Sequence, residues 1–249
     1  MRISFSKLEL YEFCPFAYRL RYIERQKLPF SKSLVVGAIV HAVLRNFFEA
    51  LQLKADVSYE DFKDMHEEYW SNAPTLDPHR FPEVWSTSID LLTSFWSANQ
   101  NNFGAPIMLE QRFRLRMDLE DAHTVEGVID RVDETLSGVE VIDYKSGGTP
   151  QSFPRRQKSQ LHTYALALER GFNQSVSRLT VYYLRDNQAI SMEPNYEFAQ
   201  ELLGRYRMAS ASIASGSFAP KPGSWCAGCD FFATCSHRWT GATKTSNSL

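Results

Sequence analysis

The stretch TVEGVIDRVDETLSGVEVIDYK, residues 124–145, decides the fold of this chain. Its two ends are rich in valine and isoleucine, which favours β-strands at residues 124–133 and 139–145. The four residues at 135–138 have turn character and predict a hairpin loop. In that hairpin Asp130 lies directly opposite Asp143, and Lys145 points to the same face because side chains alternate along a strand.

Two opposed carboxylates repel each other unless a cation lies between them. Asp130 and Asp143 therefore predict a metal site at the hairpin. Lys145 would add a fixed positive charge beside that site, which suits the stabilisation of an attacked phosphate. The alternative from these residues alone is an ordinary surface hairpin with charged side chains.

The composition is that of a soluble globular protein, with 43% hydrophobic and 22% charged residues among 249. A net charge of −2 excludes a globally basic, nonspecific nucleic-acid binder, although basic residues do cluster locally. We expect no membrane span and no secretory signal, and so an intracellular, cytoplasmic protein whose cysteines are not structural disulfides.

The pattern changes from helical to mixed near Pro106. Before it, Ser6 of a capping-box sequence predicts the start of a first helix that runs to about Arg25, and apolar periodicity predicts three more helices. After it, Phe113, Leu115 and Met117 alternate with arginines, as in a half-buried strand. The predicted helices are 34–53, 58–72, 83–102, 156–170 and 195–214, and the further strands are 107–117 and 177–185.

The chain has four cysteines, Cys14 near its start and Cys226, Cys229 and Cys235 near its end. The last three have C-x2-C-x5-C spacing, a compact arrangement for a thiolate-bound metal, and Cys14 is the remaining thiol that can complete it. Zinc and a [4Fe–4S] cluster both accept four thiolates. The alternatives are four reduced cysteines without a metal, or His237 as a substitute ligand.

Three helical side chains could complete the site at the hairpin. His41 lies on an apolar helix, where it is either a core histidine or a third metal ligand, and Gly37 one turn earlier would allow another backbone to approach. Gln160 and Tyr164 are four residues apart and share a helix face, from which they could bond phosphate oxygens or orient Lys145. Glu110 and Glu126 have no assigned role. Glu126 lies four residues before Asp130 on the predicted strand and so points to the same face, where it could be a further acid near the site.

Taken in order, these motifs resemble the PD-(D/E)xK nuclease superfamily, and in particular its iron–sulfur nucleases related to RecB, AddB and Cas4. The resemblance covers most of the chain. It rests on Cys14-Pro15, Gly37-x-x-x-His41, Gly127-Val128-Ile129-Asp130, Asp143-Tyr144-Lys145, Gln160-x-x-x-Tyr164 and the Cys226, Cys229, Cys235 trio.

The resemblance implies a role for each residue. His41, Asp130, Asp143 and the Tyr144 carbonyl would bind Mg²⁺ or Mn²⁺, and Lys145 would activate the attacking water or stabilise the charge that develops on the phosphate. Gln160 and Tyr164 would complete the contacts to DNA. The four cysteines would hold a [4Fe–4S] cluster rather than zinc, and this cluster would join the N- and C-terminal segments.

The implied fold is α/β (α+β), a restriction-endonuclease-like core with a mixed central sheet flanked by helices. We expect one nuclease domain over residues 1–240, made of a mainly helical part (1–105), the catalytic core (106–215) and the cysteine-rich segment (216–240), followed by a disordered tail (241–249).

The implied function is an exonuclease that acts on single-stranded DNA or DNA ends. Its setting would be either Cas4-like trimming during CRISPR spacer acquisition, with an integrase, or RecB-like repair or phage end processing, with a helicase on a separate chain. The sequence has no P-loop motif of its own. The competing readings are a noncatalytic iron–sulfur DNA-binding scaffold and a zinc-stabilised protein with unrelated chemistry.

Overall fold

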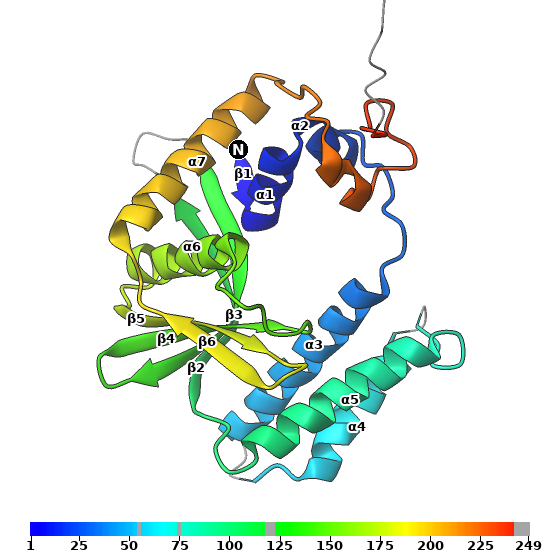
Figure 1. Ribbon diagram of the computed structural model, residues 1–249. Helices are drawn as coiled ribbons and strands as arrows, with labels where there is room; N and C mark the ends of the chain where they lie inside the picture. Colours follow the sequence, from blue (N-terminus) through cyan, green and yellow to red (C-terminus); the bar gives the residue numbers. More distant parts are fainter. Residues whose placement is uncertain (54–55, 74–75, 118–122, 242–249) are drawn as a thin grey trace, which may run out of the picture. The chain divides into compact units, whose positions relative to one another are not determined.

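The computed structural model describes residues 1–53, 56–73, 76–117 and 123–241 of the chain (Figure 1). The chain divides into two compact units. Unit 1 comprises Met1–Phe30, Arg116–Val125 and Leu203–Leu249, and unit 2 comprises Ser31–Leu115 and Glu126–Leu202.

Unit 2 is built on a mixed β-sheet. Strands β3 (Thr124–Thr135), β4 (Gly138–Lys145), β5 (Val176–Tyr183) and β6 (Gln188–Met192) lie side by side in that order, and β2 (Pro106–Arg116) pairs with β3. The β3/β4 and β5/β6 pairs are antiparallel, whereas β4 and β5 are parallel. Parallel neighbours need a crossover connection, and helix α6 (Arg155–Gly171) supplies it.

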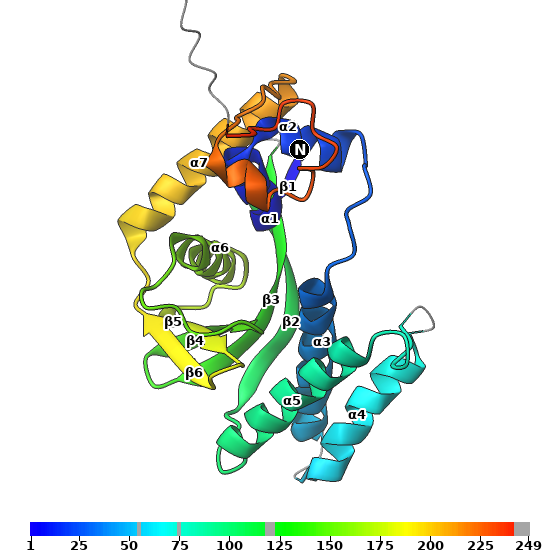
Figure 2. The same ribbon diagram turned by 45° about the vertical axis from the view of Figure 1, so that its right-hand side comes forward.

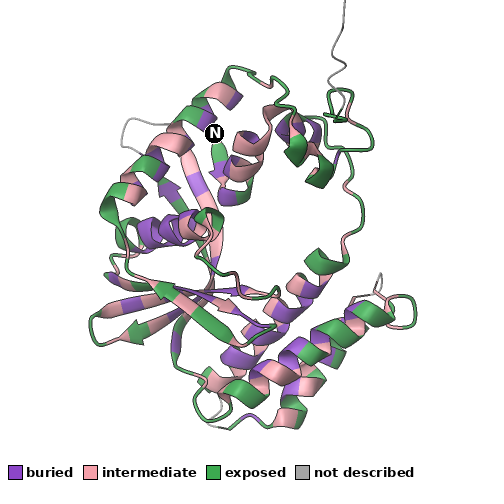
Figure 3. Ribbon diagram, viewed as in Figure 1, coloured by how far each residue is buried: buried purple, intermediate pink, exposed green. Residues whose placement is uncertain are grey.

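Helices cover both faces of this sheet (Figure 2). Helix α6 packs on β4 and β5, and Figure 3 shows it buried along most of its length. Helices α3 (Lys32–Leu53), α4 (Tyr59–Ser71) and α5 (Pro82–Asn99) pack together and share one apolar core with Tyr144, Ile142 and Tyr182 of the strands. Because side chains alternate along β4, Asp143 and Lys145 lie on the other face, toward α6.

Unit 1 holds both ends of the described chain. It contains β1 (Arg2–Ser4), α1 (Phe5–Phe13), α2 (Pro15–Tyr18), a π-helix (Arg19–Ile23), most of α7 (Tyr196–Ala214) and a 3₁₀ turn (Ser224–Gly228). The Arg205 guanidinium of α7 donates to the Glu12 carboxylate at 2.5 and 2.8 Å, and the Tyr11 hydroxyl donates to the Ser217 carbonyl at 2.7 Å. These contacts fasten the N-terminal helix to the C-terminal segment.

The structure differs from the sequence-based expectations in several places. The first helix is capped by Ser4 rather than Ser6, since the Ser4 hydroxyl accepts the Lys7 N–H, and the helix breaks at Cys14, where Pro15 forces the preceding residue into an extended conformation. The short strands β1 and β6 were not predicted. The hairpin turn is also shorter, because β3 continues to Thr135 and β4 already begins at Gly138.

Helix α3 is 22 residues long and apolar enough to cross a membrane by length and composition alone. Seven of its side chains, however, are buried in the core of unit 2: Val36, Ile39, Val40, Val43, Leu44, Phe47 and Phe48. A buried core helix passes the same test. The predicted disordered tail lies, apart from Gly241, outside the described residues.

Candidate active site

Three side chains from separate elements of unit 2 form a group that could hold a metal ion. His41 of α3, Glu110 of β2 and Asp130 of β3 each offer a ligand atom, and these atoms all lie within 4.8 Å of one another. The His41 Nδ1 atom is 3.4 Å from Asp130 Oδ2, and its Nε2 atom is 3.1 Å from the Tyr144 carbonyl oxygen. The Tyr144 carbonyl oxygen, which the sequence analysis named as a metal ligand, therefore lies next to His41 of this group.

The hairpin brings Asp143 to this group. The register of the hairpin ends with Arg131 opposite Ile142, and Asp130 and Asp143 are the next residues along their strands. The Tyr144 N–H donates to Asp130 Oδ2 at 3.0 Å, which holds that carboxylate against β4.

Glu110 reaches the site through an unusual backbone conformation. Its φ angle is +44°, in the left-handed region that non-glycine residues rarely adopt. Such conformations cost free energy and persist where the surrounding structure enforces them, often at functional sites. The strand therefore departs from regular geometry at the residue that supplies the third ligand atom.

Asp143 and Lys145 form a close ion pair in which the Lys145 Nζ atom is 2.5 Å from Asp143 Oδ2. Asp143 is almost fully buried, and among the described residues its carboxylate oxygens have no polar partner other than the Lys145 ammonium. A buried carboxylate with unfilled acceptor sites is costly unless a cation compensates it. Asp143 therefore suits a position next to a bound cation.

A hydrogen-bonded chain on α6 orients Lys145. Lys145 Nζ donates to Gln160 Oε1 at 3.2 Å, and Gln160 Nε2 donates to the Tyr164 hydroxyl at 2.7 Å.

The Phe113 ring packs edge-on against the Tyr164 ring and fills the space beside Gly127. A Cβ atom on Gly127 would come within 2.8 Å of the Phe113 ring. Gly127 is thus required for close packing next to Asp130.

The charges of the site shift its pKa values in opposite directions. Burial, together with the charge of Asp130, raises the pKa of Asp143 to about 6, and burial followed by the Asp130 charge also raises the pKa of Glu110. Burial alone would raise the pKa of Asp130, but the charges of His41 and Lys145 and hydrogen bonds from His41 and Tyr144 lower it. Burial opposes a charged His41, yet Asp130 and Asp143 outweigh it and raise the pKa of His41 to about 9.

This donor set fits a divalent cation. Carboxylate oxygens, a backbone carbonyl and one imidazole are ligands that Mg²⁺ or Mn²⁺ accepts, and the imidazole favours Mn²⁺. The clustered carboxylates and the unfilled acceptor sites of Asp143 are what a cation would neutralise.

Of the residues in this group, the sequence analysis named His41 and Asp130 as candidates and left Glu110 unassigned. The compact group contains Glu110 where Asp143 was expected, with Asp143 held by Lys145 beside it. Glu126 lies 4.0 Å from Arg114 and is not in the group. The expectation for Gly37 was wrong, because a Cβ there would meet only the Ser146 hydroxyl at 3.9 Å, an ordinary contact.

The four cysteines lie together in unit 1. None of them forms a disulfide, all are partly buried, and all line one pocket with Ala17, Leu20 and Phe231. Burial raises the pKa of the Cys229 thiol, and the nearby Cys14 and Cys235 raise it further. Their sulfurs do not form a group within 4.8 Å of one another among the residues the structure describes, so no ligand cluster is preformed.

Comparison with known proteins points to one family. The model of the PD-(D/E)XK nuclease superfamily matches residues 2–236. One subunit of the ATP-dependent helicase/nuclease of Bacillus mycoides (strain KBAB4) and its counterpart in Bacillus cereus (strain AH820) are each 24% identical over 204 residues, which cover 72% of this chain and 16% of theirs. The chain therefore matches only a small part of these relatives. The crystal structure of SSO0001 aligns with 93% of this chain and 98% of its own at 15% identity and a TM-score of 0.42, too low to support an argument.

Proposed function

Because the chain belongs to the PD-(D/E)XK nuclease superfamily, we propose that it is a metal-dependent DNA nuclease whose active site is the group described in unit 2. We propose an exonuclease that works inside the cell on single-stranded DNA or DNA ends. The observation that carries the proposal is the pairing of Lys145 with the buried Asp143 beside His41, Glu110 and Asp130.

Each residue has a distinct task in this proposal. His41, Asp130, Asp143, Glu110 and the Tyr144 carbonyl would hold Mg²⁺ or Mn²⁺, which when bound lowers the pKa of a water and polarises the phosphate. Lys145 places its ammonium where negative charge develops on the attacked phosphate or positions the attacking water.

Gln160 and Tyr164 assist Lys145. The Gln160 carbonyl oxygen accepts from Lys145, so it fixes the direction of the ammonium group. The Tyr164 hydroxyl, which accepts from Gln160, fixes the Gln160 amide in turn. Both side chains also offer hydrogen-bonding groups to a phosphate backbone.

The proposal includes a [4Fe–4S] cluster bound by Cys14, Cys226, Cys229 and Cys235. Its support is that the four free thiols line one pocket in unit 1. Cys14 and Cys235 are more than 200 residues apart in sequence, so a cluster would constrain the unfolded chain and stabilise the fold. Its role in this proposal is structural.

A test of the cluster is purification under anaerobic conditions followed by iron, sulfide and zinc analysis. We expect brown absorbance that Cys229→Ala loses together with thermal stability, while the neighbouring Thr234→Ala keeps both. A colourless protein with stoichiometric zinc would contradict the iron–sulfur assignment.

The partner proposal rests on what the matching relatives are named. Those relatives are named as helicase/nuclease subunits, and the chain spans 16% of their length. We propose a helicase on a separate chain, in a RecB-like repair or phage setting, and the Cas4-like setting with an integrase as the alternative. Neighbouring genes distinguish the two.

The activity test is incubation of 5′- and 3′-labelled single-stranded DNA with Mn²⁺, Mg²⁺ or EDTA. We expect metal-dependent shortening from a DNA end that Lys145→Ala lowers by at least about 100-fold. The matched control is Lys63→Ala, which removes a lysine that pairs with Glu60 on α4, away from the site.

Two outcomes would contradict this function. Full cleavage by a folded, metal-loaded Lys145→Ala protein would refute the assigned role of the lysine. Metal-independent DNA binding without cleavage would favour the second candidate, a noncatalytic iron–sulfur scaffold within a larger nuclease complex.

A further inference from the structure

Arg131 carries a buried positive charge on the face of the sheet opposite to the acidic site. The residue is 5% exposed. Its guanidinium donates to both carboxylate oxygens of Asp133 at 2.5 Å, to the Tyr144 hydroxyl at 3.1 Å and to the Phe103 carbonyl at 2.7 Å. Its central carbon lies 4.1 Å from the centre of the Phe48 ring. A buried charge is stable only when it is paired and hydrogen-bonded in this way.

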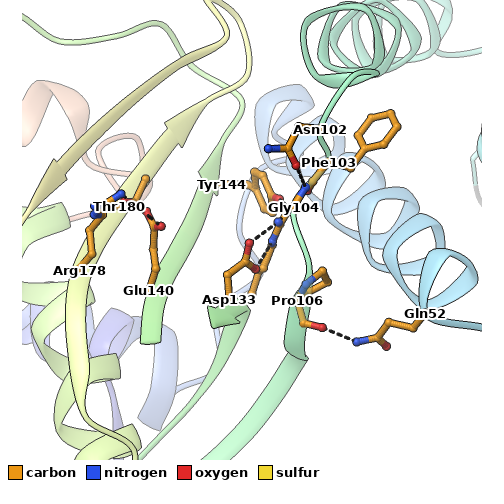
Figure 4. A network of polar contacts seen from close by, with 11 residues as sticks. Gln52, Asn102, Phe103, Gly104, Pro106, Asp133, Glu140, Tyr144, Arg178 and Thr180 are labelled. Carbon is orange, nitrogen blue, oxygen red and sulfur yellow. Dashed lines mark hydrogen bonds and ion pairs between the residues drawn. The ribbon is translucent and has the colours of Figure 1, made fainter. Parts of the chain in front are cut away.

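The partners of Arg131 come from four separate segments of unit 2. Figure 4 shows Asp133 and Tyr144 of the hairpin meeting the Phe103–Gly104 backbone, which lies between α5 and β2. Phe48 comes from α3. The approach is close, since a Cβ atom on Gly104 would lie 2.2 Å from the Arg131 guanidinium.

The same four segments carry the groups of the acidic site. Helix α3 carries His41, two turns before Phe48 and so on the same side of the helix. The segment that contains Phe103 leads into β2 and Glu110. Strand β3 carries Asp130 directly before Arg131, and β4 carries Asp143 directly before Tyr144.

We propose that Arg131 is a positioning residue. Its guanidinium holds the four ligand-bearing segments together on the face of the sheet opposite to the acidic site, so that the site is preformed for its cation. This inference rests on the proposed metal-dependent function.

The physical reason is the repulsion among the carboxylates. Glu110 and Asp130 offer ligand atoms within 4.8 Å of each other, and the buried Asp143 is the residue of β4 that follows Ile142, the register partner of Arg131. Without a cation this repulsion pushes β2, β3 and β4 apart. The planar guanidinium opposes it, because its fixed fork of donors binds three segments at once while its face stacks on Phe48.

Lysine cannot replace this arrangement, since an ammonium is a point charge without the planar fork. Arg131→Lys therefore keeps the charge and removes the geometry. Tyr144→Phe removes only the hydroxyl that links the guanidinium to β4 and keeps the Tyr144 carbonyl in the site. The matched control is Tyr182→Phe, because Tyr182 pairs with Tyr144 in the ladder and its hydroxyl accepts from Asn99 at 2.8 Å, away from Arg131.

The experiment measures Mn²⁺ affinity of the purified full chain by calorimetry and by electron paramagnetic resonance, without DNA, together with melting temperature. Mutation of groups that orient metal ligands typically weakens metal binding by about 10- to 100-fold. We expect a loss in that range for Arg131→Lys, a smaller loss for Tyr144→Phe and no change for Tyr182→Phe. We also expect a broadened Mn²⁺ spectrum in Arg131→Lys.

Wild-type Mn²⁺ affinity in both the Arg131→Lys and Tyr144→Phe proteins, with lowered melting temperatures, would overturn the proposal and leave Arg131 a stabilising residue only. If Arg131→Lys does not fold, Tyr144→Phe decides by the same criterion. Because the readout is metal binding, a wild-type protein that binds Mn²⁺ but cuts no DNA would refute the nuclease proposal and leave this one standing.

Discussion

Replacing Asp143 by asparagine should stabilise the metal-free protein and abolish its response to metal. Burial and the charge of Asp130 raise the pKa of Asp143 from 3.8 to about 6. A carboxyl with a raised folded pKa destabilises the fold once both states are ionised. The cost is absent below pH 3.8, grows up to about pH 6 and is complete above it.

The magnitude follows from the size of the shift. Two pKa units correspond to about 3 kcal/mol, since each unit is 1.36 kcal/mol. This value already includes the attraction of Lys145, which lowers the pKa. At about pH 8 with a chelator, Asp143→Asn should therefore raise the free energy of unfolding by up to about 3 kcal/mol.

Bound metal should remove most of this difference in stability. A ligand at 100 times its dissociation constant stabilises the folded state by about 2.7 kcal/mol. The wild type should gain this amount in Mn²⁺, whereas Asp143→Asn should gain little. The assay is urea unfolding with EDTA or with saturating Mn²⁺.

The control for this assay is Asp186→Asn, which removes an exposed carboxylate that accepts from the Thr149 N–H. That hydrogen bond lowers the pKa of Asp186, so its removal should bring no gain in stability and should leave the Mn²⁺ response intact. The reasoning fails if Asp143→Asn is no more stable than wild type in EDTA, or if Mn²⁺ stabilises it as much as wild type.

Three further predictions concern single groups. Burial lowers the pKa of His41, but Asp130 and Asp143 outweigh this effect and raise it to about 9, so the imidazole is cationic at neutral pH. Mn²⁺ binding should therefore release a proton and strengthen as pH rises. Calorimetry in buffers of different ionisation enthalpy measures the proton release, and binding independent of pH would contradict the prediction. Glu110→Gln should weaken Mn²⁺ binding on the order of tenfold or more, whereas unchanged affinity would remove Glu110 from the ligand set. Burial lowers the pKa of His66 to about 4, so stability should fall by up to about 3 kcal/mol as pH drops from 6.5 through 4; His66→Gln should flatten that part of the pH profile, and an identical slope would refute the assignment.

Regular elements with strong patterns were predictable from the sequence. The apolar periodicity of α3 and the alternation of Phe113 and Leu115 with arginines gave the helix and the strand nearly at their observed ends. The short strands β1 and β6 escaped prediction, because three to five residues carry too little pattern to distinguish a strand from a loop. The cap was misplaced by two residues because Ser4 and Ser6 are equivalent by type, and only the backbone conformation decides between them.

The residues of the candidate site also divide into those that the sequence predicts and those that it does not. The identities of Asp130, Asp143 and Lys145 and their shared face follow from the two-residue period of the strands and the hairpin that joins them. Glu110 could not be assigned from sequence, because its left-handed backbone breaks that period, and a strand pattern assumes regular geometry.

The sequence by itself therefore determined where the long strands form, that Asp130, Asp143 and Lys145 share a face of the hairpin, and which family the chain resembles. Those features depend on local periodicity and residue type, which a sequence displays directly. Only the tertiary structure decided that Glu110 joins His41 and Asp130, and that the Arg131 guanidinium meets Phe48, Phe103 and Tyr144 behind them. Such contacts join segments far apart in the chain, and their geometry is set by how helices and sheet pack, which no local pattern encodes.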